Sequence, residues 1–280
     1  MSGLTRSVVW LNSVSNALGR IVLAPIGAMP GWLSATLVAI LTGVLMLVMF
    51  KYTSHQRAIK QVRNRIKANL LALKLFKDNT AAVVRSQVGL VTGALRLLGL
   101  SLVPMLVMLV PVTLLMTQLA LWYQASPLRV GDATIVTLAL NRPDSDTLSQ
   151  VQLQSSPGIE IVTGPVRIPS TGEVCWSLRA TESGYPRLMF RLGEQEVEKE
   201  LAVGDGYMRV SMLRPSWSWI DVLLHPAEPP FRPESLVKSI AVDYPKRRSW
   251  TSGTDHWVIY WLVVSMAVAF ILRPILKVNV

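Results

Sequence analysis

The residue types that most often perform catalysis or bind metals are scattered along this sequence. The three histidines, His55, His225 and His256, lie in separate segments, and no pair has the spacing of metal ligands. The single cysteine, Cys175, excludes an intrachain disulfide, and its place beside Trp176 in a strand-like stretch favours a buried core thiol. No nucleophile motif, phosphate-binding loop or dinucleotide fingerprint occurs. The sequence therefore gives no positive indication of an enzyme, a metal site or a cofactor.

One segment concentrates acidic side chains at every second position. Alternate side chains of an extended strand share one face of a sheet. Such a pattern is typical of a solvated strand face, and we prefer this interpretation to a catalytic or calcium-binding role. The acids concerned are Glu194, Glu196, Glu198 and Glu200.

Three long apolar stretches, 32–50, 97–123 and 257–272, account for much of a composition that is 51% hydrophobic. Each stretch is close to the ~20 residues that a helix needs to cross the hydrocarbon of a bilayer. A backbone in lipid must satisfy its own hydrogen bonds, so all three are predicted to be helices. The sequence thus predicts an integral membrane protein with three transmembrane helices, bounded as 31–51, 97–124 and 256–274.

The distribution of charge predicts the orientation of the chain. Residues 51–96 carry ten Lys or Arg and one acid, whereas residues 127–255 carry fourteen Lys or Arg and sixteen acids. Short basic loops stay in the cytoplasm. We therefore expect residues 52–96 inside, the N-terminus and residues 125–255 outside, and the tail 275–280 inside a bacterial inner membrane. The sequence pI of about 10.2 also suits nucleic-acid binding, but cations beside membrane spans more often set topology and attract anionic lipid.

Residues 52–96 are predicted to form a cytoplasmic, antiparallel coiled-coil hairpin. Apolar residues recur three or four apart in both arms, as helix seams require. The first-arm seam is Ile59, Val62, Ile66, Leu70, Leu73 and Phe76, and the second is Val84, Val88, Val91, Leu95 and Leu98. The basic surface of the hairpin comprises Arg57, Lys60, Arg63, Lys67 and Lys74. Candidate cations at the inner membrane face are Lys51, Arg96 and Arg273.

Several polar and methionine side chains interrupt the predicted spans. These residues are candidates for lining a shared polar groove within the membrane. Packing between helices is the alternative for the polar residues, and lipid-facing filler is the alternative for the methionines. The candidates are Thr42, Met46, Ser101, Met105, Thr113, Gln118 and Ser265.

The pattern changes to period two after the second span, which predicts short strands. They are expected at 134–140, 149–154, 159–163, 173–181, 187–192, 195–203 and 208–212, with a returning strand at 236–244. Seven short strands in residues 125–214 suggest an immunoglobulin-like β-sandwich. Residues 215–255 are rich in Pro and Trp and are expected to lie near the membrane interface. Residues 1–30 predict an amphipathic helix in the outer interface that ends near Pro25.

The order of these parts resembles the YidC/Oxa membrane-insertase superfamily, in particular its three-span branch that includes the core insertase subunit of the endoplasmic-reticulum membrane complex. The segments that carry the resemblance are 51–56 after the first span, 65–68 and 73–78 in the hairpin, and 269–274 at the end of the last span. The likeness is to little-characterised bacterial members and covers roughly residues 30–123 and 256–280. This sequence departs from the family in two respects: the first span carries no arginine before Lys51, and the β-rich domain lies between the second and third spans.

The resemblance implies transfer of weakly hydrophobic segments into the bilayer without nucleotide hydrolysis. The expected partners are membrane lipids, nascent or substrate membrane proteins, the ribosome or other membrane-complex subunits, and an extracytoplasmic protein. The alternative from a different class is a membrane-anchored scaffold whose β-sandwich binds an outer partner.

Overall fold

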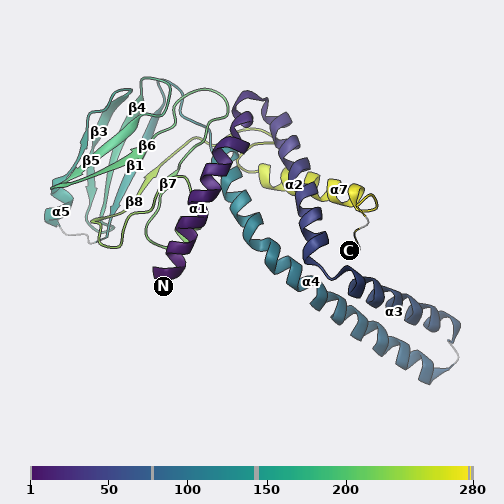
Figure 1. The fold of residues 1–280 in the computed structure, drawn as a ribbon. Coiled ribbons are helices and arrows are strands. Elements are labelled where there is room, and N and C mark those ends of the chain that lie inside the picture. Colours follow the sequence, from purple (N-terminus) through teal and green to yellow (C-terminus); the bar gives the residue numbers. More distant parts are fainter. Residues whose placement is uncertain (1, 77–78, 142–144, 277, 279–280) are drawn as a thin grey trace. The chain divides into compact units, whose positions relative to one another are not determined.

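The computed structural model describes residues 2–76, 79–141, 145–276 and 278 of the chain (Figure 1). Residues 277, 279 and 280 of the predicted tail, and residues 77 and 78 of the predicted hairpin, therefore lie outside the described residues. The chain divides into two compact units. Unit 1 comprises Met1–Ala35 and Leu114–Tyr260, and unit 2 comprises Thr36–Thr113 and Trp261–Val280.

Helices form where the sequence is apolar or amphipathic at helical spacing. The longest, α4, runs without interruption through Pro104 and Pro111. The helices are α1 (Ser2–Val22), the 3-10 helix η1 (Ala24–Ala28), α2 (Gly31–Thr53), α3 (Gln56–Leu75), α4 (Thr80–Tyr123), α5 (Ser145–Gln150), α6 (Trp219–Leu224) and α7 (Trp257–Leu272).

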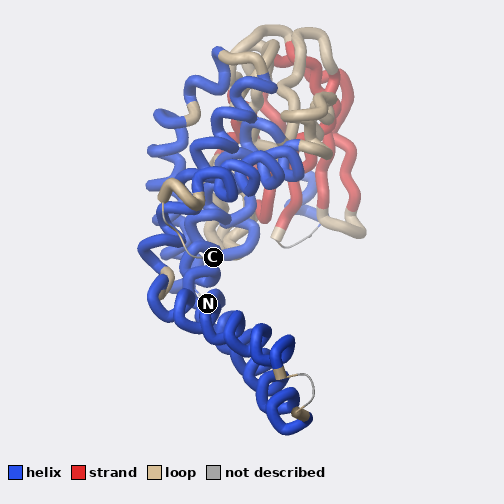
Figure 2. The backbone as a smooth tube through the Cα atoms, turned by 90° about the vertical axis from the view of Figure 1, so that its right-hand side faces the viewer, coloured by secondary structure: helices blue, strands red, loops and turns tan. Residues whose placement is uncertain are grey.

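The β-rich part of unit 1 contains two antiparallel sheets, coloured red in Figure 2. One sheet has the order β3-β4-β1-β8-β7, and the other has the order β2-β5-β6. With the helices, they make the chain an α+β protein. The strands are β1 (Ala133–Leu140), β2 (Val151–Gln154), β3 (Ile159–Ile168), β4 (Glu173–Ala180), β5 (Arg187–Leu192), β6 (Gln195–Glu200), β7 (Leu213–Arg214) and β8 (Val237–Val242).

Alternating burial along the strands builds one hydrophobic core. In β1, Thr134 and Val136 are buried while Ile135 between them is exposed. Trp176 of β4 and Phe190 of β5 join the two sheets, with ring centroids 5.3 Å apart. Period two in the sequence therefore predicted the buried faces of β1, β4 and β5, which bury one face only, whereas β3 is exposed along most of its length.

Several predicted strands were wrong in part. β3 continues to Ile168, beyond the predicted end at residue 163, and β6 ends at Glu200, before the predicted end at residue 203. Residues 149–150 belong to the end of α5, so β2 begins at Val151. The segment 208–212 is not a strand, and the pairing with β8 is made instead by Leu213 and Arg214. The returning strand predicted at 236–244 is confirmed as β8, which lies between β1 and β7. Alternation alone does not indicate whether a neighbouring strand is available, and this explains the shift of β7.

Two helices, α2 and α4, are long and apolar enough to cross a membrane. The third apolar helix, α7, has 16 residues and is shorter than this criterion. At 1.5 Å per residue it spans about 24 Å, against ~30 Å of hydrocarbon. A third membrane span therefore remains a prediction.

α3 and the first part of α4 form a helical hairpin (Figure 1). Its first arm departs from the predicted seam at Leu70 and Phe76, which are exposed, and the larger departure is in the second arm. The expected seam residues of that arm, Val84, Val88, Val91, Leu95 and Leu98, are each about 60% exposed. The face of α4 that contacts α3 is instead made of small residues. A Cβ added to Gly93 would lie 2.7 Å from Ile66 Cγ1, and one added to Gly89 would lie 2.4 Å from the Asn69 amide. The seam assignment was wrong because an apolar stripe need not face the partner helix when small residues let two backbones approach closely.

Within unit 2, α2 and α7 also pack through small residues. A Cβ on Gly43 would lie 2.5 Å from the carbonyl oxygen of Ser265. Beside this contact, Trp261 Nε1 donates a 2.9 Å hydrogen bond to Thr42 Oγ1. Both polar side chains are buried.

Within unit 1, α1 packs through its polar face. Asn12 Nδ2 donates to the carbonyl of Val222 in α6, and Asn16 Nδ2 donates to that of Pro226, both at 2.5 Å. The apolar side chains of α1, including Trp10, Leu18 and Ile21, are exposed. The helix thus turns its hydrophobic stripe away from the protein.

Candidate functional site

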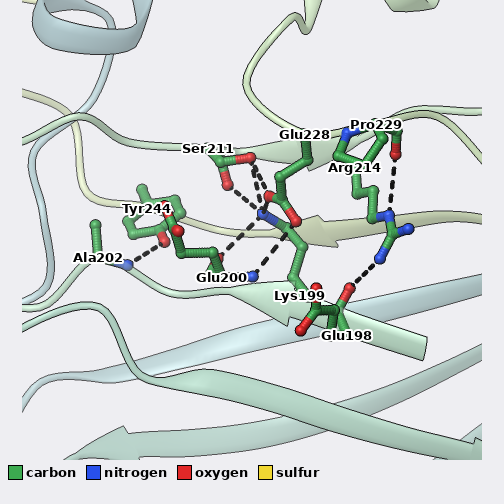
Figure 3. Close-up of polar contacts among 9 residues, drawn as sticks. All are labelled: Glu198, Lys199, Glu200, Ala202, Ser211, Arg214, Glu228, Pro229 and Tyr244. Carbon is green, nitrogen blue, oxygen red and sulfur yellow. Dashed lines mark hydrogen bonds and ion pairs between the residues drawn. The ribbon is translucent and has the colours of Figure 1, made fainter. Parts of the chain in front are cut away.

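The most unusual polar group of the β-rich domain is Lys199, a fully buried lysine in β6 (Figure 3). Its Nζ donates to Ser211 Oγ at 2.9 Å, to the Ser211 carbonyl at 2.6 Å and to Glu228 Oε1 at 2.5 Å. Burial lowers the pKa of Lys199 below its ordinary value, and the carboxylate of Glu228 opposes this shift. A buried ammonium is stable only when it is paired and fully hydrogen-bonded, and these three partners meet that requirement.

Neighbouring groups complete a continuous polar cluster around Lys199 (Figure 3). Ser211 Oγ donates to Glu228 Oε1, and the backbone N–H of Glu200 donates to Glu228 Oε2 at 3.4 Å. The buried Tyr244 hydroxyl accepts a 2.8 Å hydrogen bond from the Ala202 N–H, and burial raises the pKa of this tyrosine. The cluster ties β6 to the Pro-rich segment that follows α6.

A serine beside a lysine can act as a nucleophile with the lysine as its general base. These two side chains, however, are not accessible to a substrate. Ser211 is 5% exposed and its hydroxyl proton is directed at Glu228. Lys199 is 0% exposed and its ammonium is engaged by a carboxylate. We therefore interpret the cluster as structural.

A second polar cluster in unit 1 joins the N-terminal ends of α2 and α7 to the C-terminal end of α4. Trp257 Nε1 donates to Gln124 Oε1 at 2.9 Å, and Thr254 Oγ1 donates to the Gln124 carbonyl at 2.7 Å. Arg247 donates to the Ala125 carbonyl, and its guanidinium lies 3.9 Å from the ring centroid of Tyr207. The segment before α7 is thus held against the residues that follow α4.

The same cluster includes the first turn of α2. Tyr123 donates a 3.0 Å hydrogen bond to Ser34 Oγ, and the Tyr207 hydroxyl lies 2.6 Å from Ser252 Oγ. A Cβ on Gly31 would lie 1.8 Å from the Tyr207 hydroxyl, so this position requires glycine. No family model matches the chain, and no curated protein is significantly similar to it. The function must therefore be argued from these contacts and surfaces.

The seven candidate groove residues are distributed over both units. Thr42 and Ser265 are both buried where α2 packs on α7: Thr42 accepts from Trp261, and the backbone of Ser265 faces Gly43. Gln118 belongs to unit 1, where its Nε2 donates to Asn16 Oδ1 of α1 at 2.8 Å. These three contacts favour the alternative of helix packing for the residues concerned.

The other four candidates lie on α2 and α4 without such partners. Ser101 and Thr113 donate to carbonyls of their own helix, those of Leu97 and Leu109. Met105 is 70% exposed, and Met46 is half-buried. Exposed methionine on an apolar helix is compatible with either a lipid-facing or an adaptable surface.

The predicted hairpin cations lie on α3, and the three predicted inner-face cations lie on α2, on α4 and directly after α7. Arg57, Lys60, Lys67 and Lys74 of α3 are exposed, and Arg63 is half-buried. Arg96 of α4 is exposed and Lys51 of α2 is half-buried. Arg273 donates from Nε to the Val278 carbonyl at 3.3 Å.

Sequence reasoning missed Lys199 because three glutamates alternate with it and with Val197 in β6. The sequence did contain a signal, which is the two-residue period of a strand. The glutamates occupy every second position, so Val197 and Lys199 between them must face the opposite side of β6. A lysine on the inward face of a strand requires a buried acid, and only the fold identifies that acid as Glu228.

Proposed function

We propose that this protein is an integral membrane protein that assists the insertion or folding of other membrane proteins. The observation that carries the proposal is the exposed stripe Val84, Val88, Val91, Leu95 and Leu98, here called the α4 stripe. Successive helical residues rotate by about 100°, so the α4 stripe lies on the side of the helix opposite Gly89 and Gly93, which face α3. The stripe is therefore available to a partner.

The α4 stripe leads directly into the apolar part of the same helix. Leu102, Met105 and Leu109 are exposed beyond it, and α4 is unbroken between Thr80 and Tyr123. An apolar segment bound to the stripe would meet no polar barrier along this helix on its way to the bilayer. The basic residues of α3 would attract acidic flanks or anionic lipid by long-range charge.

The length of α7 supports the same proposal. A 16-residue helix is shorter than the hydrocarbon, and a short span thins the bilayer around it. Local thinning lowers the cost of moving polar flanks across the membrane. We place the hairpin in the cytoplasm of a bacterial inner membrane and residues 125–214, with their proposed immunoglobulin-like sandwich, on the outer side.

Site-specific cross-linking tests the proposal. A photoreactive residue replaces Leu95 in the α4 stripe, and the matched control replaces Asn64, which is exposed on α3. We expect adducts with a nascent few-span membrane protein from position 95 and none from position 64. Adducts with lipid alone from position 95 would instead show that the hairpin only lies on the membrane.

Depletion provides an independent test. Membrane proteomics after depletion should show lower levels of short-tailed or few-span membrane proteins. Unchanged levels of all of them would count against insertase activity.

The alternative, a membrane-anchored scaffold, is favoured by the polar cluster that fixes the β-rich domain to the ends of α2, α4 and α7. Deleting residues 127–250 separates the two functions. An insertase should keep part of its activity, whereas a scaffold should lose all of it.

A further inference from the structure

One edge of β6 is not paired with another strand. The sheet order β2-β5-β6 leaves one side of β6 without a neighbouring strand. The Leu201 N–H donates to Pro186 O on the β5 side, whereas the Glu200 N–H and the Glu198 carbonyl are bonded by side chains from elsewhere. By the two-residue period of a strand, the backbone groups of Glu196, Glu198 and Glu200 face away from β5.

Side chains of the polar cluster occupy one end of this edge (Figure 3). Glu228 accepts the Glu200 N–H, and Arg214 Nη1 donates to the Glu198 carbonyl at 2.5 Å. Farther along, no described residue hydrogen-bonds to the N–H of Glu198 or to the outward backbone groups of Glu196. Unpaired strand edges are ready to accept another strand.

A groove of about 940 Å³ lies along the open end of the edge. This volume is near the upper limit of ordinary ligand pockets. The groove is lined by Met189, residues 195–198, Arg214, residues 229–232, Glu234 and Ser235.

The wall of the groove opposite β6 cannot complete the sheet itself. Pro229 and Pro230 have no N–H to donate. The N–H of Phe231 is already bonded to the carbonyl of Pro215. Residues 229–231 therefore offer no free N–H donor to a bound chain, whereas the edge of β6 offers both donors and acceptors.

The side chains of β6 define what chain would fit. Glu196 and Glu198 share the outer face, and Val197 faces inward, half-buried. Residues directly opposite one another on neighbouring strands interact, and opposite charges stabilise the pair. The guanidinium of Arg214 is already engaged by the carbonyls of Glu198 and Pro229 and lies over Phe231.

We propose that the edge of β6 binds an extended segment of a partner protein by strand addition, and that basic side chains of this segment alternate with apolar ones. The basic residues lie against Glu196 and beside Glu198, whose carboxylate already pairs with Arg187 Nη1 of β5 at 3.0 Å, and the apolar residues face the side of Val197. This binding is independent of the proposed insertase function, because every residue involved belongs to the β-rich domain.

Peptide binding to the full chain in nanodiscs tests this proposal. The probe is a fluorescent hexapeptide of alternating Lys and Val, measured by anisotropy. We expect saturable binding, and we expect the Glu196→Lys variant to weaken it by roughly tenfold because an attractive pair becomes repulsive. The control Glu194→Lys reverses an equally exposed glutamate just outside the groove and should change binding by less than about twofold.

Two N-methylated peptides test whether binding depends on hydrogen bonds between the peptide backbone and β6. N-methylation removes amide donors from either the lysines or the valines, and only one of these two sets can face β6. We expect one methylated peptide to lose binding and the other to keep it. A peptide with Glu in place of Lys should recover binding to Glu196→Lys, which shows that this variant remains folded.

The proposal is overturned by any of three outcomes. These are no saturable binding at millimolar peptide, equal binding of both methylated peptides and the parent, and equal weakening by Glu194→Lys and Glu196→Lys. The last two would show attraction to a generally acidic surface without strand addition. Slower hydrogen exchange at the Glu196 and Glu198 amides on peptide binding is the supporting structural readout.

Discussion

At the scale of single residues, the pairing of Lys199 with Glu228 dominates the polar interior of the β-rich domain. The lysine side chain is fully buried and the glutamate side chain is 13% exposed, so neither charge is well solvated. Breaking such a pair leaves an unpaired charge behind, which costs more than the pair itself contributes. The pair also links β6 to the segment that walls the peptide groove.

The first prediction concerns this pair. Lys199→Met should lower the free energy of unfolding by about 3–5 kcal/mol, because the Glu228 carboxylate and the Ser211 carbonyl lose their donor. Denaturant unfolding followed by tryptophan fluorescence measures this loss. The double variant Lys199→Met with Glu228→Met should cost less than the sum of the two single changes, and strict additivity would contradict direct coupling.

The second prediction concerns His225, at the end of α6. Burial lowers the pKa of His225, and the nearby Asp221 opposes the shift while Lys199 adds to it. The folded pKa lies below the unfolded value of about 6.5. The stabilisation of the folded state by neutral His225 is therefore fully present above that pH. It is lost as the pH falls below about 6.5 toward the folded pKa, where the unfolded state binds more protons.

Melting temperatures at pH 7.5 and pH 5.0 check this prediction. The decrease in melting temperature from pH 7.5 to pH 5.0 should be smaller for His225→Asn than for the unmodified protein. His256→Asn, a change at an exposed histidine, serves as the control and should keep the original difference. An unchanged difference for His225→Asn would show that other groups set the acid sensitivity.

At the scale of elements, close contact between α3 and α4 depends on glycine. Gly93 faces the β-branched side chain of Ile66, whereas a Cβ on Gly99 of the same helix meets nothing within 4 Å. These two positions separate the effect of packing from that of helix propensity. Substitutions at Gly93 and Gly99 also test whether α3 packs on the α4 stripe or on the glycine face of α4.

The third prediction uses this pair of glycines. Gly93→Leu should separate the two arms or distort them, at a cost of roughly 1–3 kcal/mol from overpacking, whereas Gly99→Leu should be neutral or stabilising. Distances between spin labels on exposed positions of α3 and α4 measure the separation. Arms that move apart equally in both variants, or in neither, would contradict the assigned contact face.

At the scale of the whole molecule, the charge asymmetry predicts opposite sides of a membrane for the hairpin and the β-rich domain. The chain has one cysteine, Cys175, which is half-buried in β4 with its Sγ 3.5 Å from Thr137 Oγ1. A Cys175→Ala background therefore allows single cysteines to be placed elsewhere for labelling.

The fourth prediction is that Ser170→Cys, in the exposed turn after β3, is labelled in intact cells by a membrane-impermeant maleimide. Gln87→Cys, exposed on α4, should be labelled only after the membrane is made permeable. The reverse labelling pattern would show that the orientation is opposite to the predicted one. The hairpin would then lie outside the cytosol and could not contact a nascent chain there.

The sequence determined the elements because they depend on local periodicity. Helical spacing in residues 56–75 and uniform apolarity in residues 97–123 place α3 and the second half of α4 almost at their observed bounds. Period two identifies β1, β4 and β5 and their buried faces, since alternate side chains point to opposite sides whatever the neighbouring strand is. The final strand, β8, was also predicted for this reason.

The tertiary structure alone decided which surfaces meet. The stripe Val84, Val88, Val91, Leu95 and Leu98 has the spacing of a coiled-coil seam, yet α3 packs on the glycine face of α4, because the closeness of two backbones is not encoded in hydrophobic periodicity. The partner of Lys199 lies 29 residues away in an irregular segment, and no spacing rule connects it to the strand. The open edge of β6 likewise became visible only when the order of the strands was known, because an edge is defined by the neighbour that a strand lacks.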